Sequence, residues 1–206
     1  MNIEIKRLTP DLADDYAHFF DVTPHDVNID ENKCYCVTWR SDDTYVGDGD
    51  HWFPTREERR HRAIEFVKAG SIQGYLAYRD GKIVGWCNAN ADCQFCVTYL
   101  RSFWPIDEYL ADIKVKSIFC FVIAPEVQRM GVATKLLERV CQDAAADGFD
   151  FVEAYAYKDF YTEPNDMNTE PHDFRGPLAM YEKCGFGIHA EREGKVVMRK
   201  ALQVEP

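Results

Sequence analysis

The amino-acid sequence predicts an α/β (α+β) fold in which strands and helices follow one another around one sheet. Ile118–Ile123 is a continuous apolar run, as expected of a strand that is covered on both faces. After a short turn, apolar residues recur at helical spacing from Val132 to Ala144, and Gly148 ends this pattern. Stretches typical of hairpins lie on both sides of this strand and helix.

The N-terminal part predicts one strand and two helices. Apolar residues alternate over 3–8, which is typical of a strand. Thr9-Pro10 then supplies a cap and a first-turn proline for a helix that runs to about Phe20. Thr55–Glu58 is a capping box, so a second helix is expected from there to Gly70.

The remaining elements are predicted from turn residues and apolar runs. Asp80-Gly81 suits the left-handed conformations of a tight hairpin turn, and strand-like residues flank it on both sides. Further along the chain we expect another strand, a short helix and a final hairpin. The segments concerned are 72–78 and 82–87 for the first hairpin, 151–157 for the strand, 178–183 for the helix, and 188–191 and 196–200 for the last hairpin.

Composition limits the class of protein. The 206 residues, 46% of them hydrophobic, suit one compact domain over 1–206. The net charge of −11 argues against nucleic acid and anionic lipid as partners and favours a cationic or neutral one. No apolar run approaches the roughly 18 residues of a membrane span, so we expect a cytoplasmic location. Cys87, Cys120 and Cys141 lie within apolar patterns, which predicts reduced thiols rather than disulfides.

The turn Gln128–Ala133 joins the apolar strand to the long helix. The first backbone N–H groups of a helix have no partner within it, and the helix dipole places partial positive charge there. Gly131 lets the backbone approach a ligand, and Ala133 keeps the next exposed position small. The junction therefore predicts a site for an anionic phosphate.

This turn, of the form Q-x-x-G-x-A, and the later Met180–Phe186 segment resemble motifs of the GNAT superfamily of N-acetyltransferases. The resemblance extends from Ile118 to Lys200. It implies a mixed, mostly antiparallel sheet of about seven strands flanked by helices. It also implies that acetyl-CoA is the co-substrate, that no metal is needed, and that the acetyl group passes directly to an amine in a ternary complex.

The resemblance also implies roles for individual residues. Tyr181 would be the general acid that protonates the departing thiolate, and a backbone N–H near Val122 or Ile123 would stabilise the oxyanion. Many family members have an asparagine at the position of Phe174; Arg175 and Gly176 are the nearby replacements for its contact with the cofactor arm. The residues expected to bind acetyl-CoA are Phe121, Val122, Ile123, Gln128, Arg129, Met130, Gly131, Val132, Ala133, Thr134, Gly176, Tyr181 and Lys183.

The acceptor side is less defined. Glu153 is a candidate general base because its strand position can face the cleft; Asp112, Glu126, Glu163 and a water chain are alternatives. Insertions at 21–54, 88–113 and 158–177 are expected to surround the pocket of a small-molecule or peptide amine. The sequence does not decide between a monomer and a homodimer. Aromatic residues either line this pocket or pack in the core: Trp39, Trp52, Trp86, Phe95 and Trp104.

Two other readings exist. Cys34 and Cys36, on one face of a strand, could bind zinc together with Cys93 and Cys96, although no histidine lies at ligand spacing and packing explains the first pair equally well. Alternatively, the same scaffold could be a non-catalytic acyl-CoA sensor or partner-binding domain. Tyr181 within its expected motif favours the enzyme.

Overall fold

The computed structural model describes residues 2–24, 33–41, 53–91, 104–105, 113–158 and 174–202. Its centre is a seven-stranded sheet with the strand order β1-β2-β3-β4-β5-β7-β6. Only β4 and β5 pair in parallel; the other neighbouring strands are antiparallel. This confirms the predicted mixed, mostly antiparallel sheet. The strands are β1 Glu4–Arg7, β2 Gly74–Arg79, β3 Lys82–Asn90, β4 Val115–Ile123, β5 Phe151–Tyr157, β6 Gly187–Arg192 and β7 Lys195–Ala201.

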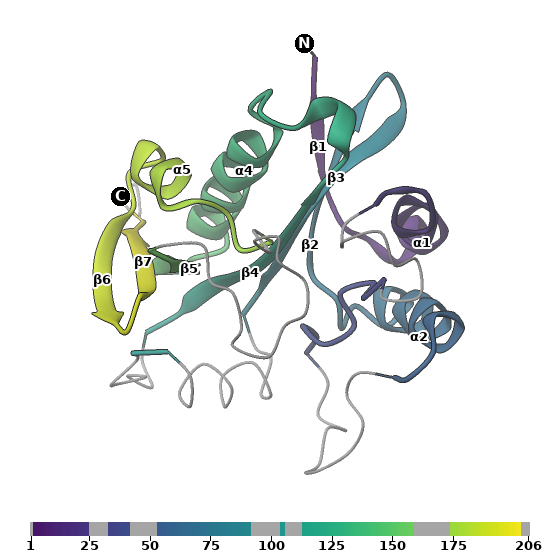
Figure 1. The fold of residues 1–206 in the computed structure, drawn as a ribbon, viewed down its shortest axis with the longest axis horizontal. Helices are drawn as coiled ribbons and strands as arrows, with labels where there is room; N and C mark the ends of the chain where they lie inside the picture. The colour runs from purple at the N-terminus through teal and green to yellow at the C-terminus, as the bar shows by residue number, and fades with distance from the viewer. Residues whose placement is uncertain are drawn as a thin grey trace.

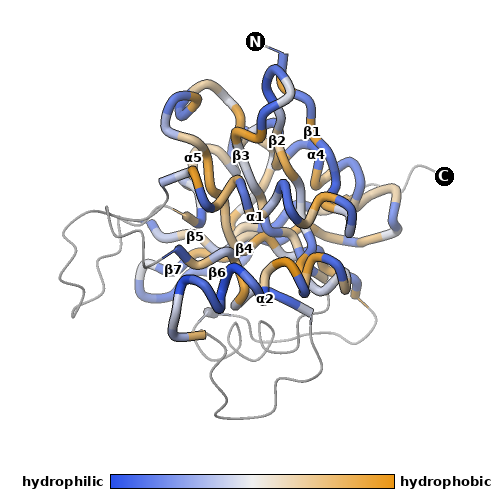
Figure 2. The backbone as a smooth tube through the Cα atoms, turned by 90° about the vertical axis from the view of Figure 1, so that its right-hand side faces the viewer, coloured by the Kyte–Doolittle hydropathy of each residue, from blue (hydrophilic) through white to orange (hydrophobic). Residues whose placement is uncertain are grey.

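Helices cover both faces of the sheet (Figure 1). One face carries α4 and α5, and the other carries α1 and α2. Two clusters of buried side chains fill the two layers, and the hydrophobic segments of the chain run through the sheet between them (Figure 2). The helices are α1 Ala13–Val22, α2 Arg56–Lys68, α4 Val132–Ala146 and α5 Leu178–Lys183.

Local signals in the sequence are confirmed in detail. Thr55 caps α2 by accepting a hydrogen bond from the Glu58 amide over 3.1 Å. Asp80 and Gly81 both have positive φ angles, 50° and 78°, in the β2–β3 turn. The first helix differs slightly, because Pro10–Leu12 form a 3₁₀ turn before α1 and the Thr9 side chain makes no capping bond.

The parallel pair β4–β5 separates part-way along its length. Its register ends at Ile118 opposite Ala154. At the same point β4 contains a bulge: Ile118 pairs with Ala89 and Cys120 with Asn88, so that Phe119 has no partner of its own on β3. Beyond the bulge β4 follows β3 and β5 follows β7. The result is an opening in the sheet, which we call the β4–β5 gap.

The predicted strand around Cys34 and Cys36 is wrong. These residues lie in a turn with left-handed φ angles at Tyr35 (47°) and Cys36 (54°). Burial raises the pKa of the Cys34 thiol to about 12, which disfavours the thiolate that zinc requires. The described part contains no group of three potential metal ligands, and its cysteines are free thiols. Cys93 and Cys96 lie outside it. No described helix is long and apolar enough to cross a membrane.

Charged side chains attach α4 to the first strand. Asp143 accepts hydrogen bonds from Arg139 over 2.7 Å and from Arg7 over 3.1 Å, and Arg7 also reaches Asp147. Arg139 in turn donates to the Ile5 carbonyl. Burial opposes ionisation of the Asp143 carboxyl, but hydrogen bonds from Arg139, Tyr75 and Arg7 outweigh it and lower its pKa.

Replacing Asp143 with asparagine should therefore lower the free energy of unfolding by about 1 kcal/mol near pH 7. Because the folded pKa is depressed, this stabilisation is present above the unfolded pKa and is lost as the pH falls through the folded one. Urea unfolding of parent and variant should give different midpoints near pH 7 and converging midpoints towards about pH 3. Glu4→Gln, in an exposed pair with Lys6, is the control and should change little at either pH. A pH-independent difference would contradict this account.

Candidate active site

The turn at the start of α4 presents a set of backbone donors. Gly131 has φ 82° and Arg129 has φ 59°, both in the left-handed region. Within this turn, the Gln128 amide donates to the Pro125 carbonyl and the Met130 amide donates to the Val127 carbonyl. In the helix that follows, Lys135 is the first residue whose amide donates to a preceding carbonyl, that of Gly131. The amides of the turn and first helical positions that donate to no carbonyl of the described chain are those of Arg129, Gly131, Val132, Ala133 and Thr134.

Side chains of the turn hold it in place and leave its amides open. The Gln128 side chain donates to the Ile123 carbonyl over 3.2 Å and thereby fixes the turn to the end of β4. Val132 is buried against the core, whereas Arg129 and Met130 are exposed. A Cβ atom at Gly131 would meet no protein atom within 4 Å. The turn therefore fits an anion, because its amides have no backbone acceptor in the described chain and the space beside Gly131 is open.

The β4–β5 gap is lined by a second donor from the backbone of β4. The Phe121 N–H donates to the Phe174 carbonyl over 2.6 Å, and so faces the gap and not β3. Successive N–H groups of a strand point to opposite sides, which directs that of Val122 towards its β3 partner Trp86 and that of Ile123 towards the gap. Of the two backbone N–H groups expected to donate to an oxyanion, that of Ile123 faces the gap. The N–H group of Phe121 faces the gap as well.

Tyr181 supplies a side-chain donor at the same gap. Its side chain is fully buried, its ring packs edge-on against Phe186, and its hydroxyl donates to the Arg175 carbonyl over 2.5 Å. Gly176 has φ 81°, and a Cβ there would lie 2.8 Å from Met180 Cε and 3.3 Å from the Tyr181 hydroxyl. We call Phe174–Gly176 the gap segment. Two of its consecutive carbonyls accept from the two donors, Phe121 N–H and Tyr181 O–H.

Glu153 lies on the α1/α2 side of β5, opposite Ser117 and just before the gap opens. Its carboxylate forms an ion pair with Arg199, and it accepts a hydrogen bond from the Tyr155 hydroxyl over 3.0 Å. The Tyr155 hydroxyl also lies 3.0 Å from the Ser117 hydroxyl. Glu153 thus contacts Tyr155, whose ring packs on Phe119 beside the gap. Sequence reasoning did not single out Tyr155, because only the bulge and register bring it there.

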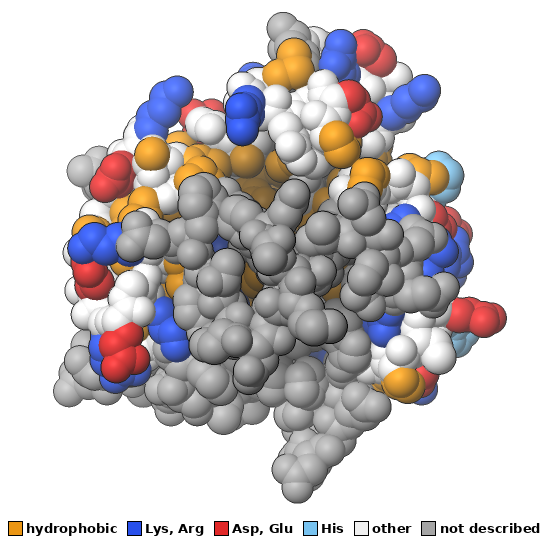
Figure 3. Space-filling model, in the orientation of Figure 1, with side chains coloured by type: hydrophobic (Ala, Val, Ile, Leu, Met, Phe, Trp, Pro, Cys, Tyr) orange, Lys and Arg blue, Asp and Glu red, His pale blue; other side chains and the backbone are white. Residues whose placement is uncertain are grey.

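The other predicted residues divide into three groups. Lys183 is exposed on α5. Glu126 is exposed beside the turn Gln128–Ala133, which we call the phosphate turn. Trp86 is fully buried in the core, while Trp39 and Trp104 lie with Phe119 and Tyr155 in one aromatic cluster. Asp112, Glu163, Trp52 and Phe95 lie outside the described residues. In the space-filling view, apolar side chains gather in the upper part of the face shown, with Lys and Arg side chains around them (Figure 3).

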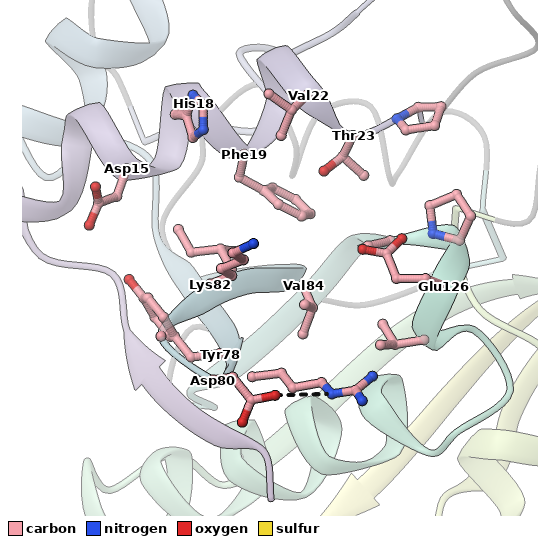
Figure 4. Close-up of a pocket in the computed structure, with 17 residues that line it drawn as sticks. Asp15, His18, Phe19, Val22, Thr23, Tyr78, Asp80, Lys82, Val84 and Glu126 are labelled. Carbon is pink, nitrogen blue, oxygen red and sulfur yellow. Dashed lines mark ion pairs between the residues drawn. The ribbon is translucent and has the colours of Figure 1, made fainter. Parts of the chain in front are cut away.

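A separate pocket of about 620 Å³ lies between the end of α1, the β2–β3 hairpin and residues 124–127. Asp15, His18 and Phe19 reach it from α1, and Lys82 and Val84 face them from β3 (Figure 4). The pocket lining ends at Val127, so it includes no residue of the phosphate turn and none of the gap segment. The pocket is therefore distinct from the donors described above.

A helix N-terminus with open amides is the feature that the turn Gln128–Ala133 predicted, and in the structure a split parallel strand pair lies next to it. Residues 36–186 match the family model described as "Acetyltransferase (GNAT) family". The chain belongs to the GNAT family of acetyltransferases. A search of curated proteins finds no match.

Solved structures of GNAT acetyltransferases share the fold. Ribosomal-protein-S5-alanine acetyltransferase from Vibrio fischeri aligns with a TM-score of 0.55 and 12% identity, over 100% of this chain and 97% of that one. A GNAT acetyltransferase from Streptococcus pneumoniae aligns with a TM-score of 0.50 and 19% identity, over 98% of this chain and 100% of that one. PaiA N-acetyltransferase from Thermoplasma acidophilum, in complex with coenzyme A, aligns with a TM-score of 0.51 and 12% identity, over 98% of this chain and 99% of that one. Family and fold together support acyltransferase activity with a coenzyme A thioester.

Gly131→Ala tests the phosphate turn. Alanine at a positive φ is strained by about 1 kcal/mol, and relief of this strain would rotate the neighbouring amides away from a bound anion. We expect a small loss of stability and about a tenfold weaker binding of coenzyme A by calorimetry.

Gly148→Ala is the matched control for this substitution. Gly148 lies at the other end of α4, has φ 75°, and would also place its Cβ in open space. It should lose similar stability with unchanged affinity for coenzyme A. Equal affinities in the two variants would show that the turn does not bind the cofactor.

Proposed function

We propose that this GNAT protein transfers the acetyl group of acetyl-CoA to the amine of a small-molecule or peptide acceptor, by direct attack in a ternary complex. The observation that carries the proposal is the placement of Phe121 N–H and Tyr181 O–H at one gap, on bonds to consecutive carbonyls. The open amides at the start of α4 come shortly after the same strand, β4, along the chain.

Each donor suits one requirement of acetyl transfer. The amides of residues 129–134 would hold the pyrophosphate of the co-substrate. The gap-facing Phe121 N–H would polarise the thioester carbonyl and stabilise the charge that develops on its oxygen. The Tyr181 hydroxyl would protonate the departing thiolate, which as a moderately strong base needs an acid close by. Low exposure of Tyr181 strengthens both interactions because water does not compete for them.

The gap segment gives this proposal a specific consequence. Its Phe174 and Arg175 carbonyls accept the same hydrogens that a thioester oxygen and sulfur would need. Productive binding therefore requires the two donors to exchange carbonyl partners for the co-substrate. Each exchange takes the donor from a carbonyl of the gap segment, which costs about 1–3 kcal/mol where neither water nor a movement of the segment replaces it, and binding at the phosphate turn must offset this cost.

The same observation favours one alternative. A protein whose donors stay bound to its own carbonyls would bind acyl-CoA without turning it over, as a sensor does. Release of free thiol from acetyl-CoA in the presence of a panel of amines separates the two functions. Steady thiol release that depends on the amine supports the enzyme, and stoichiometric binding without release supports the sensor.

Tyr181→Phe should lower kcat by ~10²-fold, because the general acid is removed. Binding of acetyl-CoA should change little. Tyr16→Phe is the matched control, since Tyr16 is also fully buried and its hydroxyl also donates to a backbone carbonyl, that of Tyr35. Both variants should lose about 1 kcal/mol of stability. If the two variants have the same kcat, Tyr181 is not the proton donor.

The role of Glu153 as general base is part of the proposal and has a paired test. In this proposal the proton of the amine passes to Glu153 through the Tyr155 hydroxyl, which donates to that carboxylate, so Glu153→Gln and Tyr155→Phe should change the acidic limb of the pH–rate profile in the same way. The profile of kcat/KM against pH measures this directly. Unchanged profiles in both variants would assign deprotonation of the amine to water or to another residue.

A further inference from the structure

Two of the three nitrogen atoms in the buried guanidinium of Arg175 have no hydrogen-bonding partner. The residue is only 4% exposed, and its Nε and Nη1 atoms have no acceptor. Four aromatic rings surround it at 4.9 to 6.0 Å from the guanidinium carbon to the ring centroid. They are the rings of Trp39, Trp104, Tyr157 and Phe174. We call this arrangement the arginine cage.

The cage contains a third orphan donor. Trp104, whose ring lies 5.1 Å from the guanidinium, is 1% exposed, and its indole Nε1 has no acceptor either. Cation–π contacts offset part of the cost of burying the charge but leave the N–H groups unsatisfied. The chain has 35 Asp and Glu residues, yet none in its described part forms an ion pair with Arg175. Donors without acceptors are what an anionic ligand would satisfy.

The position of the cage excludes the pyrophosphate as this anion. Trp104, Phe119 and Tyr155 belong to the buried cluster on the α1/α2 face of the sheet, and Trp39 packs against the same cluster. Val132, at the phosphate turn, belongs to the cluster on the α4 face. The cage and the turn thus pack on opposite faces of the sheet, and we place the acceptor on the face of the cage.

We propose that the arginine cage is a subsite for a carboxylate of the acceptor, and that the acceptor is an amine that also carries a carboxylate, such as an amino acid or a peptide. This proposal rests on the proposed acetyl transfer. Arginine binds a carboxylate through charge-assisted N–H···O bonds, and Nε and Nη1, on two different edges of the guanidinium, are both without an acceptor for such a bond. An amine and a carboxylate together are close to neutral, which agrees with the acidic composition of the protein.

The main chain of Arg175 places this subsite near the chemistry. Its carbonyl accepts the Tyr181 hydroxyl, while its side chain ends in the cage. A carboxylate on the guanidinium would therefore lie about one arginine side chain from the general acid. The acceptor must span this distance, so the spacing between its amine and its carboxylate decides whether the amine reaches the gap.

The first experiment measures binding without catalysis. Thermal shift and calorimetry with phenylacetate and its neutral isostere phenylacetamide test the cage in the parent, in Arg175→Gln and Arg175→Lys, and in Trp104→Phe, which keeps an aromatic ring and removes the indole N–H. The parent should bind the carboxylate about tenfold more tightly than the amide, and Arg175→Gln should bind both equally. Arg62→Gln, an exposed arginine of α2, is the control and should behave as the parent does.

The second experiment measures acceptor choice. Amino acids with different spacing, including L-phenylalanine and 4-aminobutyrate, are compared with their carboxamides as acceptors for acetyl-CoA. Dividing the carboxylate-to-amide ratio of kcat/KM in the parent by that in Arg175→Gln cancels the difference in amine pKa between the two compounds. We expect this quotient to be about ten or more, with unchanged affinity for acetyl-CoA.

The outcomes separate the two proposals. Carboxylate binding that needs Arg175, without acetylation of any amine, would retain the subsite and overturn the proposed transfer. Acetylation without preference for carboxylates, together with equal binding of phenylacetate and phenylacetamide, would overturn the subsite alone. A loss of acetyl-CoA affinity in Arg175→Gln and Arg175→Lys, without change in acceptor preference, would assign the arginine to the co-substrate and also overturn the subsite.

Discussion

The separation of β4 from β5 is the constraint on which the site depends. Two parallel strands that stay paired satisfy each other's N–H and C=O groups and leave nothing for a ligand. The bulge at Phe119 ends this pairing after Ile118 and turns β4 towards β3. Backbone donors of β4 beyond this point need another partner, and in this structure the gap segment supplies it through the Phe174 carbonyl. A co-substrate arm competes for the same donors.

Because the gap divides the sheet, it also connects the two buried layers. Tyr181 approaches it from the α4 side, where its ring packs in the first core cluster. Tyr155 and Phe119 line the α1/α2 side within the second cluster. The gap segment passes between them, with its carbonyls at the donors and the Arg175 side chain in the aromatic cluster. A change on either side of the sheet can therefore reach the other through three residues of main chain.

Sequence patterns could predict the elements and the phosphate turn because these depend on neighbours along the chain. The Thr55 cap, the Asp80-Gly81 turn and the helix after Gly131 are of this kind, and all three are in the structure. The turn around Cys34 and Cys36 was missed because alternation of apolar residues does not reveal left-handed φ angles at non-glycine positions.

Long-range packing sets what the sequence could not show. Which amide of β4 faces the gap depends on a one-residue bulge, and such a shift exchanges the two sides of a strand. The arginine cage combines residues 39, 104, 157 and 175, which no local motif connects. A single arginine after Phe174 looks like an ordinary surface charge until its exposure and orphan donors are known.

Net charge and local charge point to different partners here, and the local arrangement decides. A formal charge of −11 repels anions at long range, but at physiological salt this field decays over about 8 Å. Inside the cage the relevant charge is that of one guanidinium in a low-dielectric surrounding, where a hydrogen-bonded ion pair is far stronger than in water. The overall charge would then act on encounter rate and exclude polyanions, while the cage selects the functional group that stays. An acidic enzyme can thus prefer an acceptor with a carboxylate, provided that the same molecule also carries its amine.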